Sequence, residues 1–118
     1  MKKFNLWGEG KYLDFWSINH FLSGVVLTGW GVFFGFSLKI SFVVYVALAI
    51  GWEIFEIFKG IHEYFGNKVM DVVTGIIGSL LICVFYLTDN PISFLALICL
   101  TIVYILIEVW GYVSYKMR

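Results

Sequence analysis

The chain has few charged residues, one proline and two cysteines. Only 14% of its 118 residues are Asp, Glu, Lys or Arg, against roughly 25% in an average soluble domain. With no Ser-, Gly- or Pro-rich stretch, the sequence predicts a single transmembrane domain over 1–118 without a flexible linker. The formal net charge is zero, so no basic surface points to nucleic acid as a partner. Cys83 and Cys99 form neither a metal-ligand spacing nor a C-x-x-C motif.

Apolar residues make up most of the chain, at 61% hydrophobic and 20% aromatic. A soluble domain of this size could not bury so much apolar surface, so the sequence predicts an integral membrane protein in contact with membrane lipids. Four apolar runs are each close to the roughly 20 residues that a helix needs to cross the hydrocarbon core. They cover about 15–36, 40–58, 70–88 and 91–113.

These runs predict an all-α fold, because a backbone in lipid must satisfy its own hydrogen bonds. The connections between them are short, which makes consecutive helices antiparallel neighbours. We therefore expect an antiparallel four-transmembrane-helix bundle. Of the eight lysines and arginines, only Lys39 would lie on one side of it. By the positive-inside rule, both termini are expected in the cytoplasm, with the protein multi-pass in the plasma membrane.

Acidic residues and a histidine interrupt the apolar runs near one end of this bundle. Glu53 and Glu56 close the second run, Asp71 opens the third, and His20 lies near the start of the first. Each shares a helix face with small residues spaced three or four apart. Small residues mark the places where membrane helices pack closely. We therefore expect these four side chains to converge on one cavity at the cytoplasmic leaflet.

Three further polar residues are expected around this cluster. Asn67 would lie at the mouth of the cavity, Glu108 would reach it from the fourth helix, and Tyr104 shares a face with Glu108. The neighbouring residues His62 and Glu63 belong to the loop between the second and third helices. Both are expected to be only a solvated face.

The cluster has the chemistry of a divalent metal site. Carboxylate oxygens with an imidazole nitrogen suit Mg²⁺, Mn²⁺ or Zn²⁺. His20, Glu53, Glu56 and Asp71 are therefore candidate metal ligands and candidate catalytic groups. A metal could activate water or bind a phosphate, and a protonated carboxyl could act as a general acid. Alternatively, Glu53 and Glu56 extend to the interface and pair with Lys59, without further role.

The spacing of these residues resembles the VanZ-like group of small polytopic membrane proteins. The matching motifs are Asp14-x5-His20-Phe21-x2-Gly24, Trp52-Glu53-x2-Glu56 and Asn67-x3-Asp71-x3-Gly75-x2-Gly78. The resemblance covers roughly 14–80 and implies a bacterial inner-membrane protein linked to the cell envelope. The chain departs from the group's pattern at Glu56, where Gln is common, and at Thr74-Gly75, where Asn often follows the Asp. Asn67-Lys68 also replaces an arginine-containing segment, so the resemblance does not fix a shared substrate.

Three functions are open at this point. The first is an enzyme-like site, metal-assisted, that acts on a lipid or cell-envelope precursor headgroup. The second is a small transporter that works as a homodimer and couples to protons or cations. The acids lie near one face rather than at the midplane, which counts against this function. The third is a structural or accessory protein whose polar network only specifies how the helices pack, so the sequence does not decide whether the protein is an enzyme.

Overall fold

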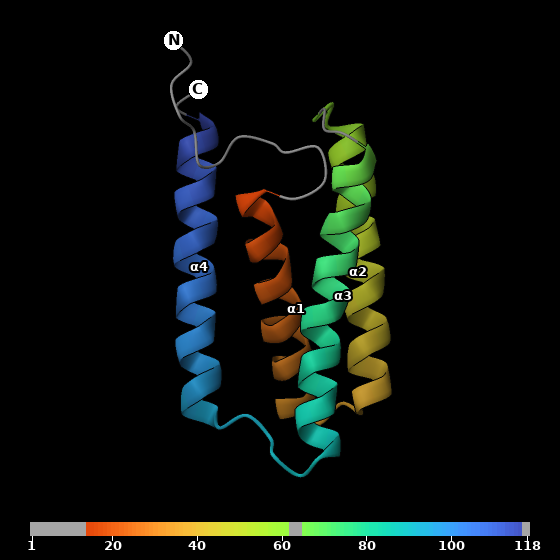
Figure 1. Ribbon diagram of the computed structural model, residues 1–118, viewed down its shortest axis with the longest axis vertical. Helices are drawn as coiled ribbons and strands as arrows, with labels where there is room; N and C mark the ends of the chain where they lie inside the picture. Colours follow the sequence, from red (N-terminus) through yellow and green to blue (C-terminus); the bar gives the residue numbers. More distant parts are fainter. Residues whose placement is uncertain (1–13, 62–64, 117–118) are drawn as a thin grey trace.

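The chain folds into four α-helices. The structure is a computed structural model that describes residues 14–61 and 65–116. The helices are α1 (Phe15–Phe33), α2 (Leu38–Phe58), α3 (Phe65–Leu87) and α4 (Phe94–Lys116). They alternate in direction, so the starts of α1 and α3 lie at the same end of the molecule as the ends of α2 and α4 (Figure 1). The prediction of an all-α protein with four helices is confirmed.

Local sequence sets the ends of these helices. The side chain of Ser37 accepts a hydrogen bond from a backbone N–H in the first turn of α2 at 3.1 Å, and Ser93 does the same for α4 at 3.1 Å. Because Ser93 caps α4, the helix begins at Phe94 rather than at Pro91. After α1, Gly35 has a φ of 99°, a left-handed conformation that glycine adopts without strain.

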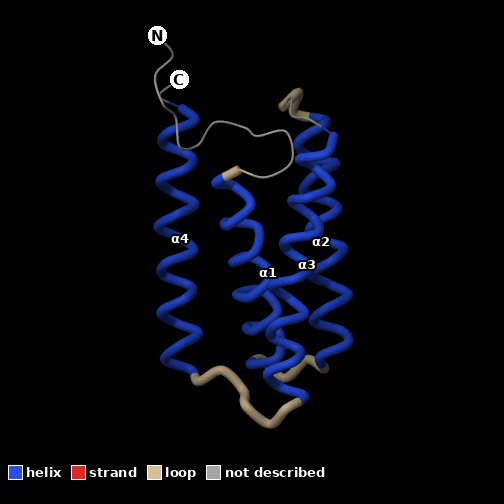
Figure 2. The backbone as a smooth tube through the Cα atoms, in the orientation of Figure 1, coloured by secondary structure: helices blue, strands red, loops and turns tan. Residues whose placement is uncertain are grey.

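α1 is the central helix of the fold. It packs against each of the other three helices, and α2 also packs against α3. Among the described residues, α4 contacts only α1, and it stands apart from α2 and α3 in Figure 2. The prediction that all consecutive helices are neighbours is therefore wrong for α3 and α4. The connection from Thr88 to Ser93 carries the chain to another side of α1.

The closest helix packing joins α1 to α3. A Cβ atom added to Gly24 would overlap the backbone carbonyl of Gly75, and one added to Gly78 would overlap a backbone carbonyl of α1. Further along the same contact, the hydroxyls of Thr28 and Ser79 are hydrogen-bonded at 2.5 Å and both side chains are fully buried. Small residues of this kind allow membrane helices to approach closely.

Within the described residues, the interior of the molecule holds many polar side chains beside a small apolar core, and its exterior is largely apolar. The buried polar side chains are Ser17, Asn19, Thr28, Ser41, Glu53, Asn67, Asp71 and Ser79. Large apolar side chains such as Phe58, Phe65 and Leu106 are exposed. In water such a surface would be an aggregation liability, whereas a lipid bilayer is a suitable environment for it.

Three of the four helices are long and apolar enough to cross a membrane. They are Leu38–Phe58, Phe65–Leu87 and the Phe94–Ser114 part of α4. α1 does not meet this criterion, because polar residues such as Asn19 and His20 lower its hydropathy. The first predicted span, 15–36, is therefore not supported by composition alone. As the central helix, α1 packs against the other three helices, and its Ser17, Asn19 and Thr28 side chains are buried.

Candidate metal site

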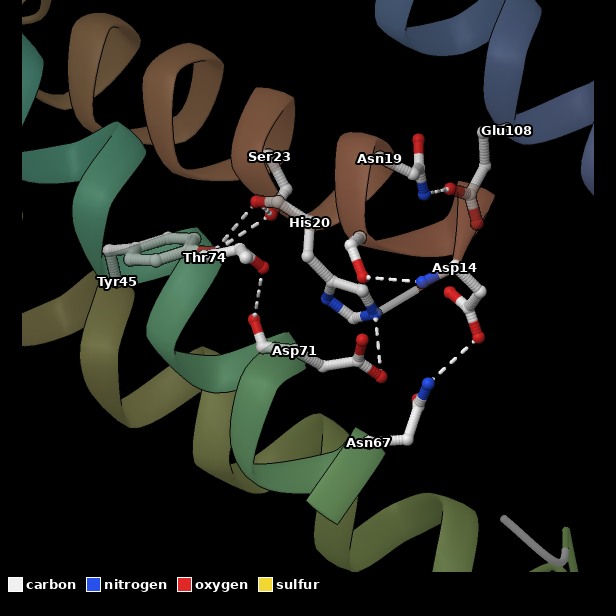
Figure 3. A network of polar contacts seen from close by, with 10 residues as sticks. Asp14, Asn19, His20, Ser23, Tyr45, Asn67, Asp71, Thr74 and Glu108 are labelled. Atoms are coloured by element: carbon white, nitrogen blue, oxygen red, sulfur yellow. Dashed lines mark hydrogen bonds and ion pairs between the residues drawn. The ribbon is translucent and has the colours of Figure 1, made fainter. Parts of the chain in front are cut away.

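Three ionisable side chains from three helices meet near one end of the fold. His20 of α1, Glu53 of α2 and Asp71 of α3 each offer one ligand atom, and these atoms all lie within 4.8 Å of one another. His20 Nε2 is 3.3 Å from Asp71 Oδ2 (Figure 3). Glu53 is only 7% exposed and Asp71 only 2%. The structure thus brings together three of the four residues predicted as ligands and catalytic groups, although those roles stay predictions.

Side-chain hydroxyls donate to backbone carbonyls around this group, and one of these hydrogen bonds joins two helices. The hydroxyls of Ser23 and Tyr45 donate to the backbone carbonyl of His20 at 2.6 Å and 3.3 Å, and they lie 2.8 Å from each other. The Thr74 hydroxyl donates to the backbone carbonyl of Asp71 at 3.1 Å. Tyr45 therefore ties α2 to the turn of α1 that carries the imidazole.

Asn67 is buried beside the group rather than exposed at a cavity mouth. Its Nδ2 donates to Asp14 Oδ2 at 2.8 Å, and the side chain has 0% exposure. The predicted position at the mouth is therefore wrong, because this amide joins the start of α3 to the residue that precedes α1. The backbone N–H of Asp14 in turn donates to Ser17 Oγ at 3.2 Å. Sequence reasoning gave Asp14 no role of its own, although an acid just before an apolar helix is a common N-terminal signal.

A hydrogen bond joins α4 to α1 beside the site. Asn19 Nδ2 donates to Glu108 Oε2, as Figure 3 shows. Asn19 is 5% exposed, and its Oδ1 has no hydrogen-bond partner within the part of the chain that the structure describes. Sequence reasoning missed Asn19, although an amide inside an apolar run is itself a signal of a specific contact.

Glu56 is not a member of the three-residue group. It is half-buried and lines a cavity that His20 and Asp71 of that group also line. The alternative in which Glu53 extends to the interface is wrong, because Glu53 is buried between helices. Lys59 Nζ lies 5.7 Å from the centre of the Phe55 ring. His62 and Glu63 fall outside the described residues.

The cavity has a volume of about 480 Å³ and is lined by residues of all four helices. This is within the range of small-molecule sites, roughly 300–1,000 Å³. Its polar wall includes His20, Glu56, Asp71 and Glu108, and Tyr104 lines it as well. The remaining lining is mainly apolar and aromatic, so the cavity is amphipathic.

The donor set of His20, Glu53 and Asp71 fits a divalent cation. One imidazole nitrogen and two carboxylate oxygens match the ligand types of catalytic zinc sites and suit Mn²⁺ as well. Three protein ligands leave coordination positions for water or a substrate oxygen. A divalent cation would also neutralise two buried carboxylates, which are costly to keep charged inside a protein.

No protein-family model, curated protein or solved structure matches this chain. The resemblance to the VanZ-like group is therefore not supported by these comparisons and depends on the motif residues alone. The chain is a small helical protein with three helices long and apolar enough to span a membrane. Its buried His20, Glu53 and Asp71 could hold a metal ion.

Proposed function

We propose that the protein is a metal-dependent membrane enzyme that acts on the headgroup of a lipid or cell-envelope precursor at the cytoplasmic leaflet. The observation that supports this most is the meeting of His20, Glu53 and Asp71 within 4.8 Å beside a cavity. Three helices contribute one ligand each. A cluster made this way requires a specific fold and does not arise from the composition of one helix.

The depth of the group suits headgroup chemistry. His20 lies little more than one turn after Phe15, the first residue of α1. At about 1.5 Å per residue, this is roughly 7–8 Å below the helix end. Water and headgroups reach this depth more easily than the bilayer centre. The same depth disfavours the transporter, whose site would be expected near the midplane.

The residues have distinct parts in this proposal. His20, Glu53 and Asp71 would hold a divalent cation, which polarises a phosphoryl or carbonyl oxygen and acidifies bound water. Glu56 stands in the cavity wall and would accept or return a proton during hydrolysis. Glu108, held by Asn19, and Tyr104 would contact the substrate from α4. The buried Asn67 would stabilise the site through its hydrogen bond to Asp14, which joins the start of α3 to the residue before α1.

Metal analysis of the purified protein tests this proposal. We expect about one divalent cation per chain in the wild type, and loss of it in Glu53→Gln and Asp71→Asn, because each removes one charged ligand. Asp89→Asn is the matched control, since Asp89 lies in the turn between α3 and α4 at the other end of the fold. Helical content by circular dichroism shows whether each variant is folded.

The contact between His20 and Asp71 also favours a structural role as a second candidate. At 3.3 Å the two side chains can satisfy each other without a metal. A structural network predicts that Glu53→Gln and Asp71→Asn lower the melting temperature while the protein carries no metal and keeps its cellular activity. That combination of results would contradict the enzyme proposal.

A further inference from the structure

The cavity beside the metal-ligand group continues along α1 toward the opposite side of the membrane. A second cavity of about 200 Å³ lies between α1 and α2 and shares Leu27, Tyr45 and Leu48 with the first. Together the two form one groove, called here the α1–α2 groove, which extends from His20 to Gly31 on α1. This is roughly 16 Å at about 1.5 Å per residue. Half of a hydrocarbon core of about 30 Å is close to that length, so an acyl chain that starts beside His20 fits along the groove.

The groove is open to the bilayer on one side. α2 and α4 both line the first cavity, and both pack against α1. Within the described residues they do not contact each other, and they lie on opposite sides of α1 in Figure 1. A hydrocarbon chain could therefore enter sideways between α2 and α4 without passing through the protein. Leu27, Leu48 and Val44 give the deeper part of the groove an apolar wall.

The shallow end of the groove has the chemistry to bind a cation. Glu56 and Glu108 line it with carboxylates, and Asn19, also in the lining, carries the buried Oδ1 described above. Within the described residues, no lysine or arginine lines the cavity. The lining also includes Trp52 and Tyr112, whose ring faces attract an ammonium group. Acceptors and aromatic rings without basic residues match an ammonium headgroup.

We infer that the α1–α2 groove binds an ammonium phospholipid from the adjacent leaflet. One hydrocarbon chain lies along Leu27 and Leu48, and the ammonium group is bound by Glu56 and Glu108. The phosphate lies toward the metal-ligand group at His20. The phosphate contact rests on the proposed metal-dependent function, whereas the ammonium and chain contacts do not.

Lipid binding to delipidated protein tests this inference. Phosphatidylethanolamine and phosphatidylglycerol with the same acyl chains are added separately, and bound lipid is counted by native mass spectrometry, with Mn²⁺ or with a chelator. We expect phosphatidylethanolamine to bind about tenfold more tightly, because its ammonium makes charge-assisted hydrogen bonds. Glu56→Gln or Glu108→Gln should abolish this preference, while Asp89→Asn keeps it.

Filling the groove provides a test of the chain contact. Ala49 lines the cavity, whereas Ala47 is exposed elsewhere on α2 and lines neither cavity. Ala49→Trp should weaken binding of both lipids about tenfold or more, and Ala47→Trp should leave binding unchanged. Equal binding of the two lipids by the wild type, or normal binding by Ala49→Trp, would overturn the inference even if a metal is present. A preference for phosphatidylethanolamine that persists with the chelator supports the inference independently of the proposed enzyme, which fails instead if the purified wild type carries no divalent cation.

Discussion

Asp71 links several parts of the candidate site. Its carboxylate contacts His20, its backbone carbonyl accepts a hydrogen bond from Thr74, and it is a member of the three-residue group with Glu53. It is 2% exposed in a protein whose outer surface is apolar. Burial of a carboxylate at this depth is unfavourable unless its neighbours compensate the charge. The arrangement around Asp71 is therefore the part of the site most sensitive to loss of charge.

The contact between Asn67 and Asp14 allows a test by exchange of the two groups. Asn67→Asp would place a second carboxylate against Asp14 in a buried setting, where the amide now donates at 2.8 Å. We expect it to lower the free energy of unfolding by about 1–3 kcal/mol, because a donor is replaced by a like charge. The double variant Asp14→Asn with Asn67→Asp restores one amide and one carboxylate, so it should recover at least half of the loss.

Thermal unfolding in detergent, followed by circular dichroism, measures both variants. A double variant as unstable as Asn67→Asp alone would show that the two side chains are not coupled.

At this scale, the sequence identified the residues better than their partners. His20, Glu53 and Asp71 could be predicted because charged groups inside apolar runs need a specific partner. The bond from Asn19 to Glu108 could not, since it depends on how α1 and α4 are rotated toward each other. Helical spacing predicts which residues share a face, but it does not predict which face of another helix it meets.

At the scale of the elements, the contact between α1 and α3 determines the geometry of the site. The backbones approach closely at Gly24 and Gly75, which sets the separation of the helices that carry His20 and Asp71. The apolar runs predicted four helices, because an apolar stretch in lipid has few alternatives. Their ends could not be predicted as well. The caps depend on single residues such as Ser93 and on the positive φ of Gly35.

Gly24→Ala should disrupt this contact. The new Cβ would overlap the backbone of α3 at Gly75, which cannot move as a flexible side chain can. We expect a loss of about 1–3 kcal/mol in the free energy of unfolding, together with reduced metal binding. Gly51→Ala in α2 is the matched control, because a Cβ there meets no atom within 4 Å. It should be neutral or stabilise α2 by up to about 1 kcal/mol.

Both glycine variants are measured by thermal unfolding and metal content in the same detergent. Equal melting temperatures for Gly24→Ala and Gly51→Ala would contradict the close approach of α1 and α3.

At the scale of the whole molecule, the position of α4 is the main departure from the expected bundle. Short connections favour antiparallel neighbours, but they do not say on which side of α1 the next helix packs. α4 packs on α1 through contacts such as the hydrogen bond from Trp30 Nε1 to Thr101 Oγ1 at 2.8 Å. Because α4 packs on neither α3 nor α2 within the described residues, the molecule keeps a groove beside α1.

The orientation of the molecule in the membrane can be tested by labelling single cysteines. The end that carries the site is expected in the cytoplasm, because Lys59, Lys68 and Lys116 lie at this end and, of the described lysines, only Lys39 lies at the other. In a background of Cys83→Ser and Cys99→Ser, Phe65→Cys marks the site end and Asn90→Cys the opposite end. A membrane-impermeant maleimide added to intact spheroplasts should label only Asn90→Cys, and permeabilisation should make Phe65→Cys reactive as well. Labelling of Phe65→Cys alone in intact spheroplasts would reverse the orientation and place the site at the outer leaflet.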